Sequence, residues 1–371
     1  MARIPLLRRG SAKDTPDLWG HTSDEIRMLT ADDGVVLHVE IDAPASRSRS
    51  GRKGPAGPSA EPTVVLVHGF TLSSQCWVLQ RRSLIHSGFR VVTYDQRSHG
   101  KSGPSPLEHC TVEQLGEDLH RVIEATCPTG PIVLVGHSMG GMTLMSYAAV
   151  HPDIVHDRVL AAAFIATSPG GSVPMTELGL GPGFARIVNS VGPGVLTRLG
   201  RHAGAIKQLR RMGSGVQDAL IRKWAFDSPV TTDLVSFVAE QFFSTPFEVI
   251  AAFLPSLEAH DQTHGLTAYS GIETLVVNGT GDLITPPEHS EELVRRLPGA
   301  EHVLIEDGGH VIMLEHPQIV SQQILMLIAR AQRAEEEGVA VSRKPRVTRT
   351  ITDLGARARG SRSRSRSTTA S

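Results

Sequence analysis

A serine stands at the centre of the segment Gly136-His137-Ser138-Met139-Gly140, which directly follows the apolar, β-branched run 131–135. The run predicts a buried strand, and the apolar residues spaced between 142 and 149 predict a helix after the serine. The glycines would let strand and helix approach closely, and the sharp turn between them would hold the serine in a strained conformation with its hydroxyl exposed. Such a turn presents a nucleophile, so the pattern predicts nucleophilic catalysis by Ser138.

A serine hydroxyl is nearly inert at neutral pH, and it needs an imidazole base and a carboxylate that orients this base. Asp282 lies just beyond the predicted buried strand 274–279, in a turn that leads into two prolines. His310 follows the short predicted strand 301–305 and two glycines, which would let the loop bring its imidazole back over the sheet. The chain order serine, aspartate, histidine is that of the α/β hydrolases among the serine hydrolases.

Donors for the developing oxyanion are expected far upstream of the serine and directly after it. Residues 62–67 predict a buried strand, and His68-Gly69-Phe70-Thr71 follows at its carboxyl end. In acyl transfer one donor would be the backbone N–H of Met139, and the other the N–H of Phe70 in this early loop. The sequence therefore predicts a complete acyl-transfer site.

Structural alternatives exist for the serine and the acid. Ser138 could sit in a glycine-rich turn that only packs a helix on a sheet, and Asp282 could bond its own backbone in a turn. Glu306 and Asp307 are the fallback acids, but they immediately precede the histidine. Asp282 at the end of a buried strand is the preferred choice.

The base also has competitors. His302 and His316 lie close to His310 in the sequence, but only His310 follows two glycines. His137 is expected to be a packed histidine, because the residue beside the nucleophile points elsewhere on such a turn. His99 is interpreted as a residue that braces its loop.

Strands alternate with helices along the chain, which predicts an α/β fold with a mostly parallel sheet covered on both faces. A hairpin is predicted over 25–30 and 35–40, and another strand over 159–167. Helices are predicted over Val78–Ser87 and Thr111–Ala125, the second opened by a capping box between Thr111 and Gln114.

The alternation of predicted strands and helices stops after Ser168, and only helical patterns follow until about Gly265. We expect a helical cap there, with helices over 184–199, 216–226, 231–243 and 246–260. The predicted parts are therefore a core in two pieces (22–168 and 266–333), a cap (169–265) and a C-terminal tail (334–371). The cap holds seven of the chain's ten phenylalanines, at 184, 226, 237, 242, 243, 247 and 253. They would pack the cap's own core and give the pocket an apolar ceiling.

The C-terminal tail is basic and of low complexity. It carries nine basic residues from Arg343 to Arg366 against a single acid, Asp353. This composition predicts disorder and a solvated tail, with contact to anionic lipid or nucleic acid as the alternative.

Composition is that of a globular enzyme. The chain has 371 residues, 40% of them hydrophobic, and a formal net charge of −1. The three cysteines (Cys76, Cys110 and Cys127) are too few for a disulfide framework and show no metal-ligand spacing. Neither an 18-residue apolar run nor a signal-peptide pattern is seen, so a cytoplasmic location is expected. The excess of 31 arginines over 6 lysines hints at a GC-rich bacterial genome.

The motifs together resemble the α/β-hydrolase superfamily in its lipase, esterase and haloperoxidase-like branch. The resemblance covers residues 22–333 and rests on His68-Gly69-Phe70, the turn 94–102, the serine turn, Gly281-Asp282 with its double proline, and Gly309-His310. It implies Ser138 as nucleophile, Asp282 as orienting acid and His310 as base. Relatives with an aspartate nucleophile, the epoxide hydrolases and haloalkane dehalogenases, are excluded because position 138 is serine.

These observations predict a serine hydrolase that cleaves a carboxylic ester of a hydrophobic acyl group, a small-molecule substrate, without a metal or organic cofactor. The same triad also serves thioesters, lactones, perhydrolysis by cofactor-free haloperoxidases and C–C bond cleavage, and the fold cannot choose among them. A ligand-binding protein on the same scaffold is the alternative of a different class. It is disfavoured because a pure binder has no need of all three groups. The oligomeric state stays open.

Overall fold

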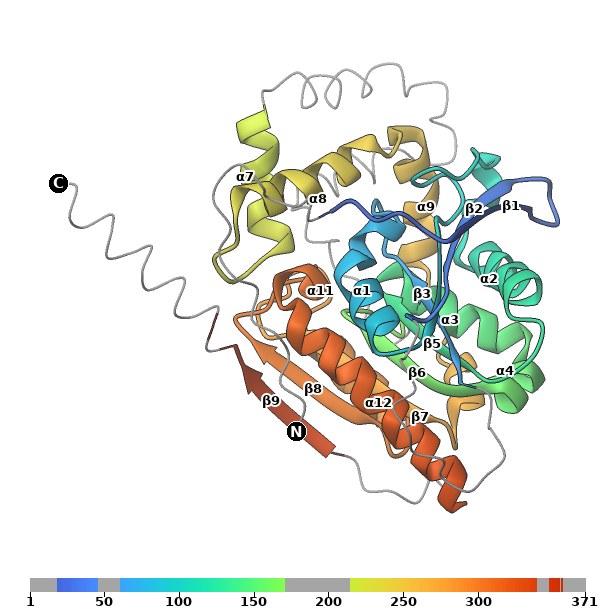
Figure 1. Ribbon diagram of the computed structural model, residues 1–371. Coiled ribbons are helices and arrows are strands. Elements are labelled where there is room, and N and C mark those ends of the chain that lie inside the picture. The colour runs from blue at the N-terminus through green and yellow to red at the C-terminus, as the bar shows by residue number, and fades with distance from the viewer. Residues whose placement is uncertain (1–18, 46–60, 171–213, 339–346, 354, 356–371) are drawn as a thin grey trace.

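One sheet of nine strands runs through the part of the chain that the computed structural model describes, residues 19–45, 61–170, 214–338, 347–353 and 355 (Figure 1). The strands are β1 (Glu25–Thr30), β2 (Val36–Asp42), β3 (Thr63–Val67), β4 (Arg90–Tyr94), β5 (Ile132–His137), β6 (Val159–Ile165), β7 (Glu273–Gly279), β8 (Glu301–Glu306) and β9 (Val347–Thr352). Their order across the sheet is β1-β2-β4-β3-β5-β6-β7-β8-β9.

The sheet is mostly parallel, as the alternating pattern predicts. Only the pairs β1–β2 and β2–β4 are antiparallel, and the first of them is the predicted hairpin. From β4 to β9 every neighbouring pair is parallel. All parallel strands therefore end at the same edge, which is where α/β folds place their ligand sites.

Helices cover both faces of the sheet because its strands are apolar on both sides. In β3, Val64 and Leu66 pack into one hydrophobic cluster, and Val65 and Val67 into another on the opposite face. The first cluster includes α1 (Val78–His86), α11 (Ile312–Glu315) and α12 (Pro317–Glu337). The second includes α2 (Val112–Thr126), α3 (Met139–Val150), α4 (Pro152–Arg158) and α10 (Pro287–Arg296).

The start of α2 has half of the predicted capping box. The Thr111 hydroxyl accepts a hydrogen bond from the backbone N–H of Gln114, at 3.2 Å. The Gln114 side chain instead donates to Asp32 in the β1–β2 turn, at 3.0 Å. The glutamine thus ties the helix to the hairpin and leaves the reciprocal bond of the capping box unmade.

Among the described residues after β6, three helices lie where a cap is expected: α7 (Ser214–Ala225), α8 (Thr232–Ser244) and α9 (Phe247–Glu258). Figure 1 shows α7 and α8 along one side of the core, beyond the sheet. They match the last three predicted cap helices closely, whereas the one predicted over 184–199 lies outside the described residues. The boundaries drawn at 168 and 265 stay predictions.

Within the described ranges, no helix taken alone has both the length and the hydropathy that crossing a membrane requires. Helices α8 and α9 pass that test only when joined, and they bend by 88° at the break between them.

The prediction of a disordered tail from residue 334 onward is wrong for part of that segment. Helix α12 continues to Glu337, and β9 adds a ninth strand in parallel register with β8. Five of the six residues 347–352 are β-branched, a composition typical of strands, and Ile351 packs against the core. The strand is anchored by contacts from Arg349 to Glu301 and from Asp353 to His316. Residues 356–371 lie outside the described ranges.

Removing every residue after Gly338 should lower the unfolding temperature by roughly 5 °C, because β8 loses its ladder of backbone hydrogen bonds to β9 and the Ile351 contact. Thermal unfolding followed by circular dichroism measures the shift. A chain that ends at residue 355 keeps β9 and is the matched control. Equal midpoints for both truncations would show that β9 adds nothing to the stability of the sheet.

Candidate active site

Ser138 lies in the turn between β5 and α3, and its backbone adopts φ of +51° and ψ of −120°. This is a costly conformation for a residue with a side chain. The turn is also tightly packed. A Cβ atom at Gly140 would lie 2.3 Å from the carbonyl oxygen of Val67, and one at Gly136 would lie 2.5 Å from that of Gly140. Both glycines are therefore required by close backbone approach, as predicted.

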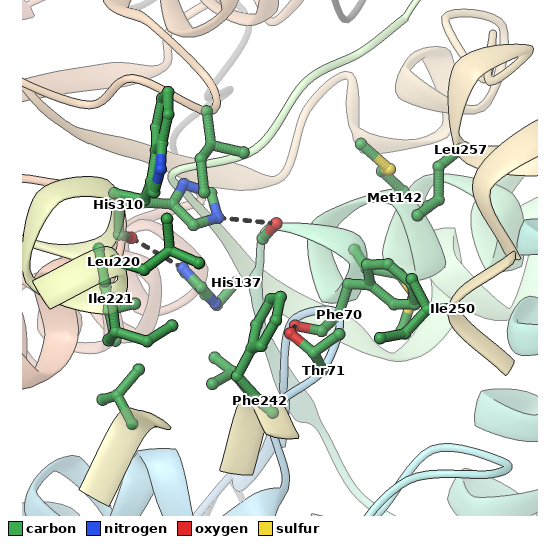
Figure 2. A pocket seen from close by; sticks show the side chains of 18 residues that line it. Phe70, Thr71, His137, Met142, Leu220, Ile221, Phe242, Ile250, Leu257 and His310 are labelled. Carbon is green, nitrogen blue, oxygen red and sulfur yellow. Dashed lines mark hydrogen bonds between the residues drawn. The ribbon is translucent and has the colours of Figure 1, made fainter. Parts of the chain in front are cut away.

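The structure brings Ser138, His310 and Asp282 together from three separate loops at the carboxyl ends of β5, β8 and β7. His310 Nε2 lies 3.0 Å from Ser138 Oγ (Figure 2). On the other side of the ring, His310 Nδ1 lies 3.0 Å from Asp282 Oδ2 and 3.2 Å from Oδ1. The three side chains form a continuous hydrogen-bonded chain from carboxylate to hydroxyl.

Asp282 is fully enclosed by donors. Its Oδ1 accepts the backbone N–H groups of Ile284 at 2.8 Å and Thr285 at 2.9 Å. The Thr285 hydroxyl donates to Oδ2 at 2.8 Å. Burial pushes the pKa of Asp282 upward, but the charge and hydrogen bond of His310 and these backbone donors together hold the pKa below its ordinary value. The carboxylate is thus kept ionised and fixed in orientation.

In the described structure, neither fallback acid is hydrogen-bonded to the ring of His310. Glu306 accepts a hydrogen bond from the Thr352 hydroxyl at the edge of the sheet. The backbone N–H of Asp307 is bound by Thr280, and its carbonyl accepts from His316. His310 Nδ1 instead donates to the Asp282 carboxylate and lies 3.4 Å from the Thr285 hydroxyl oxygen.

The competing histidines have structural partners. His302 shares a 2.9 Å hydrogen bond with Ser290 of α10. His316 lies between Asp353 and the carbonyl of Asp307, at 3.1 and 3.2 Å. Of these histidines, only His310 lies beside Ser138 in the described structure.

Phe70 and Met139, the expected sources of oxyanion donors, line the same pocket as Ser138. Met139 is the first residue of α3, and the N–H groups of a first helical turn have no acceptor within the helix. The Phe70 loop is held by His68, whose ring bonds the carbonyl of Gly69 at 2.7 Å and accepts the N–H of Gln96 at 2.9 Å. Both loops are thus fixed next to the serine.

His137 holds the backbone of His310 in place. It is fully buried, and its Nε2–H donates to the backbone carbonyl of His310 at 2.9 Å. Burial and, after it, the nearby His310 lower the pKa of His137 to about 3, so this ring stays neutral. The prediction of a packed histidine fits these contacts.

The pocket over Ser138 is almost entirely apolar (Figure 2). It holds about 900 Å³ of empty space, including the part open to solvent. Besides Ser138, the polar side chains that the described residues contribute to its lining are Thr71 and the two histidines, His137 and His310. The described lining contains no lysine, arginine, aspartate or glutamate, so it favours an uncharged ligand.

Among the described residues, no group of three or more histidine, cysteine, aspartate or glutamate side chains could hold a metal ion. The three cysteines are separate and buried.

Comparison with known proteins decides the family. The sequence model of the family described as alpha/beta hydrolase fold matches residues 62–317, well over half of the chain. The chain belongs to the α/β-hydrolase family. The fold and the family predicted from the motifs are therefore confirmed, and the protein is a hydrolase of this family.

Its relatives include esterases, lipases and haloperoxidases. The chain is 28% identical over 276 residues to the sn-1-specific diacylglycerol lipase ABHD11 of Mus musculus, covering 74% of this chain and 83% of the mouse protein. A thermophilic esterase from Thermogutta terrifontis superposes with a TM-score of 0.60 at 26% identity, over 83% of this chain and 99% of that one. A bromoperoxidase from Bacillus anthracis shares the fold, with a TM-score of 0.62 at 21% identity over 82% and 100%.

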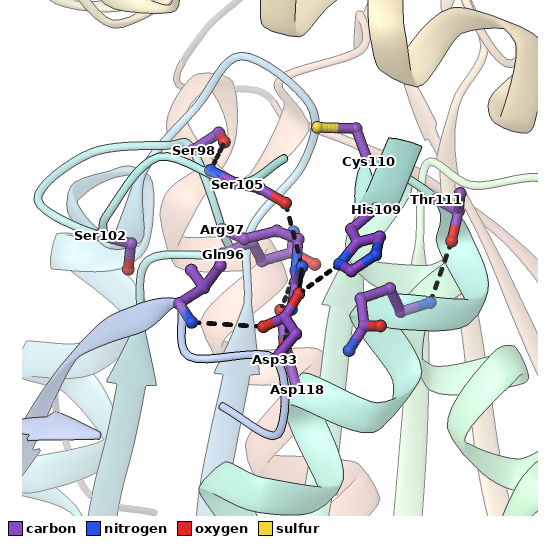
Figure 3. A network of polar contacts seen from close by, with 12 residues as sticks. Asp33, Gln96, Arg97, Ser98, Ser102, Ser105, His109, Cys110, Thr111 and Asp118 are labelled. Atoms are coloured by element: carbon purple, nitrogen blue, oxygen red, sulfur yellow. Dashed lines mark hydrogen bonds and ion pairs between the residues drawn. The ribbon is translucent and has the colours of Figure 1, made fainter. Parts of the chain in front are cut away.

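In this α/β hydrolase the turn after β4 is held by a buried ion network (Figure 3). Arg97 is completely buried and pairs with Asp118 of α2 at 2.7 Å and with Asp33 at 2.6 Å. His109 joins Asp33 at 2.7 Å. A charge buried this deeply needs such partners, so the network ties the turn to α2 and to the β1–β2 hairpin.

His99 in the same turn supports the expected oxyanion loop. Its Nδ1 bonds the carbonyl of Arg97 at 2.9 Å, and its ring packs on Phe70 and Phe253 with centroids 5.8 and 5.7 Å apart. Burial lowers the pKa of His99 to about 3. The interpretation of His99 as a loop brace agrees with this neutral, packed ring.

Glu315 is a residue near the site of this hydrolase that the sequence motifs did not indicate. Its buried carboxylate accepts the N–H of Gly309, the residue directly before His310, at 2.5 Å. It also accepts the N–H groups of Asp227 at 2.9 Å and Ser228 at 2.5 Å, in the segment after α7. Burial raises the pKa of Glu315 above its ordinary value despite these donors. The carboxylate therefore ties the loop of His310 to the helices above the pocket.

Proposed function

We propose that this α/β hydrolase cleaves carboxylic esters of hydrophobic acyl groups through a Ser138–His310–Asp282 triad. The observation that carries the proposal is the hydrogen-bonded chain from Asp282 through His310 to Ser138, which ends in an apolar pocket. The esterase and lipase relatives support it.

In the first half-reaction His310 Nε2 takes the proton of Ser138 as Oγ attacks the ester carbonyl. A bond forms between Oγ and the carbonyl carbon, and the carbonyl oxygen becomes an oxyanion held by the N–H groups of Phe70 and Met139. His310 then gives its proton to the alcohol oxygen as the C–O bond breaks, which leaves an acyl-enzyme.

In the second half-reaction His310 takes a proton from water, and the hydroxide that forms attacks the acyl carbon. The carboxylic acid leaves as Ser138 recovers its proton. Asp282 holds the imidazole in the tautomer with Nδ1 protonated and stabilises its charged form. This sequence needs no metal or organic cofactor.

Labelling with a fluorophosphonate probe and a screen of esters test the proposal. A non-catalytic ligand-binding protein would not be labelled at Ser138. Thioester hydrolysis, perhydrolysis and C–C bond cleavage use the same triad, so the screen includes a thioester and a peracid assay. A better rate on one of these would move the assignment to that reaction.

The apolar pocket predicts a preference for acyl groups longer than acetyl. Each buried methylene is worth about 0.8 kcal/mol, which raises the specificity constant up to roughly fourfold until the pocket is full. We therefore expect p-nitrophenyl butyrate or hexanoate to have a higher kcat/KM than p-nitrophenyl acetate. Initial rates over the three esters measure it. Acetate as the best substrate would instead favour a small-acyl or perhydrolase role.

The helical cap over residues 169–265 and the cytoplasmic location remain part of this proposal. The described cap helices α7 to α9 contribute Ile221, Val238 and Leu257 to the pocket lining, which supports a role of this segment in substrate binding.

A further inference from the structure

Ile221 on one side of the pocket and Met142 and Leu257 on the other belong to two different hydrophobic clusters. One wall, here called the base-side wall, consists of Leu220, Ile221 and Trp224 of α7. The opposite wall, the oxyanion-side wall, consists of Met142 of α3 and of Ile250 and Leu257 of α9. Figure 2 shows Leu220 and Ile221 on the same side of the pocket as His310, and Met142 and Leu257 on the opposite side.

The base-side wall is fixed to the loop of His310. Ile221 packs in the same cluster as Ala225 and Val311, the residue directly after the base. The backbone N–H of Val311 also donates to the carbonyl of Ala225 at the end of α7, at 3.0 Å. This wall therefore borders the space next to His310 Nε2.

The oxyanion-side wall is fixed to the expected oxyanion donors. Met142 and Leu257 pack in one cluster with Met139, and Phe70 packs against that cluster. Phe70 also contacts Phe253 of α9, with ring centroids 5.9 Å apart. This wall therefore borders the side of Ser138 away from the base.

The mechanism gives the two sides different occupants. The leaving oxygen receives its proton from His310 Nε2, so the alcohol part must lie on the side of the base. The oxyanion points to the Phe70 and Met139 amides, and the acyl chain takes the remaining direction away from the base.

We propose that the substrate is an uncharged ester with an apolar group on each side of the ester bond, its acyl chain lying on the oxyanion-side wall and its alcohol chain on the base-side wall. This inference rests on the proposed function. It assigns Leu257 to acyl selectivity and Ile221 to alcohol selectivity.

Two isomeric esters test the division. Ethyl hexanoate carries its long chain on the acyl side and hexyl acetate on the alcohol side, whereas their composition is the same. Leu257→Ala and Ile221→Ala are matched variants, because both side chains are buried and both lose three carbon atoms. The two esters compete in one reaction, and gas chromatography of the products gives the ratio of their specificity constants. The ratio does not depend on how much of the variant is folded.

We expect Leu257→Ala to lower the ratio of ethyl hexanoate to hexyl acetate by about tenfold relative to the unchanged protein, and Ile221→Ala to raise it by about tenfold. Shifts in the opposite directions, or an unchanged ratio in both variants, overturn the inference while the proposed function stands. If an alanine variant does not fold, Leu257→Val and Ile221→Val should shift the ratio in the same directions by a smaller factor. A folded wild-type protein that cleaves neither ester and is not labelled at Ser138 overturns the proposed function itself.

Discussion

Ser138→Ala should reduce ester hydrolysis by about six orders of magnitude and abolish labelling by a fluorophosphonate probe. The variant removes the oxygen that lies 3.0 Å from His310 Nε2, and nothing else in the described pocket lining carries a hydroxyl in contact with the base. The fold should be retained, because alanine has the same backbone preferences as serine at this strained position. Turnover of p-nitrophenyl hexanoate and the far-ultraviolet circular dichroism spectrum measure both parts.

Ser236→Ala is the matched control. Ser236 is exposed on α8, where its hydroxyl donates to Asp218 at 3.0 Å, and it does not line the pocket. The control should keep normal turnover and labelling. A Ser138→Ala protein with even a tenth of the normal rate would disprove the role of this serine.

The proximity of Ser138, Asp282 and His310, the proposed triad, could be predicted because each follows a short, strongly apolar strand and lies in a glycine-containing turn. Parallel strands end at one edge of the sheet, so local patterns around Ser138, Asp282 and His310 were enough to place all three side chains together. The spacing of these residues in the sequence does not give the distances between their side chains, which depend on how the three loops fold back over that edge.

Glu315 could not be predicted in this way. Its partner Ser228 lies 87 residues away in the sequence, and the partners on both sides are backbone N–H groups. Backbone partners leave no residue pattern, so only the packed structure reveals the contact. The hydrogen bond from the Thr285 hydroxyl to Asp282 was also not predicted. It could have been, because a hydroxyl residue three positions after an expected catalytic acid can reach back to its carboxylate.

Strand β9 was not predicted, because the basic, low-complexity composition of the tail was given more weight than the alternating pattern of residues 347–352. The arginines and serines around it indicate a solvated chain, yet Val347, Arg349 and Ile351 alternate with threonines, which is a strand pattern of period two. A charged side chain is accepted there because Arg349 meets Glu301 of β8. The positive charge of Arg349 is thus compensated by Glu301, which lies outside the C-terminal tail and cannot be recognised from the tail sequence.

The second large effect on turnover is expected from replacing Asp282, the proposed orienting acid. Asp282→Asn should slow turnover by roughly four orders of magnitude, as expected when the base is held in the wrong tautomer. The backbone N–H groups of Ile284 and Thr285 fix Oδ1, so the amide nitrogen of asparagine would take the place of Oδ2, 3.0 Å from His310 Nδ1. An N–H donor there forces Nδ1 to accept, which puts the proton on Nε2, where it blocks proton transfer from Ser138.

Asp307→Asn is the control for this change, since Asp307 is the fallback acid nearest to His310 in the sequence. The same kcat measurement on p-nitrophenyl hexanoate should give a rate within a few fold of the unchanged protein, because His310 Nδ1 contacts Asp282 and Thr285. NMR spectra give a second readout: the resonance of the His310 Nδ1–H proton that is hydrogen-bonded to Asp282 should be lost in Asp282→Asn and kept in Asp307→Asn. A crippled Asp307→Asn beside a mild Asp282→Asn would transfer the role of orienting acid to Asp307.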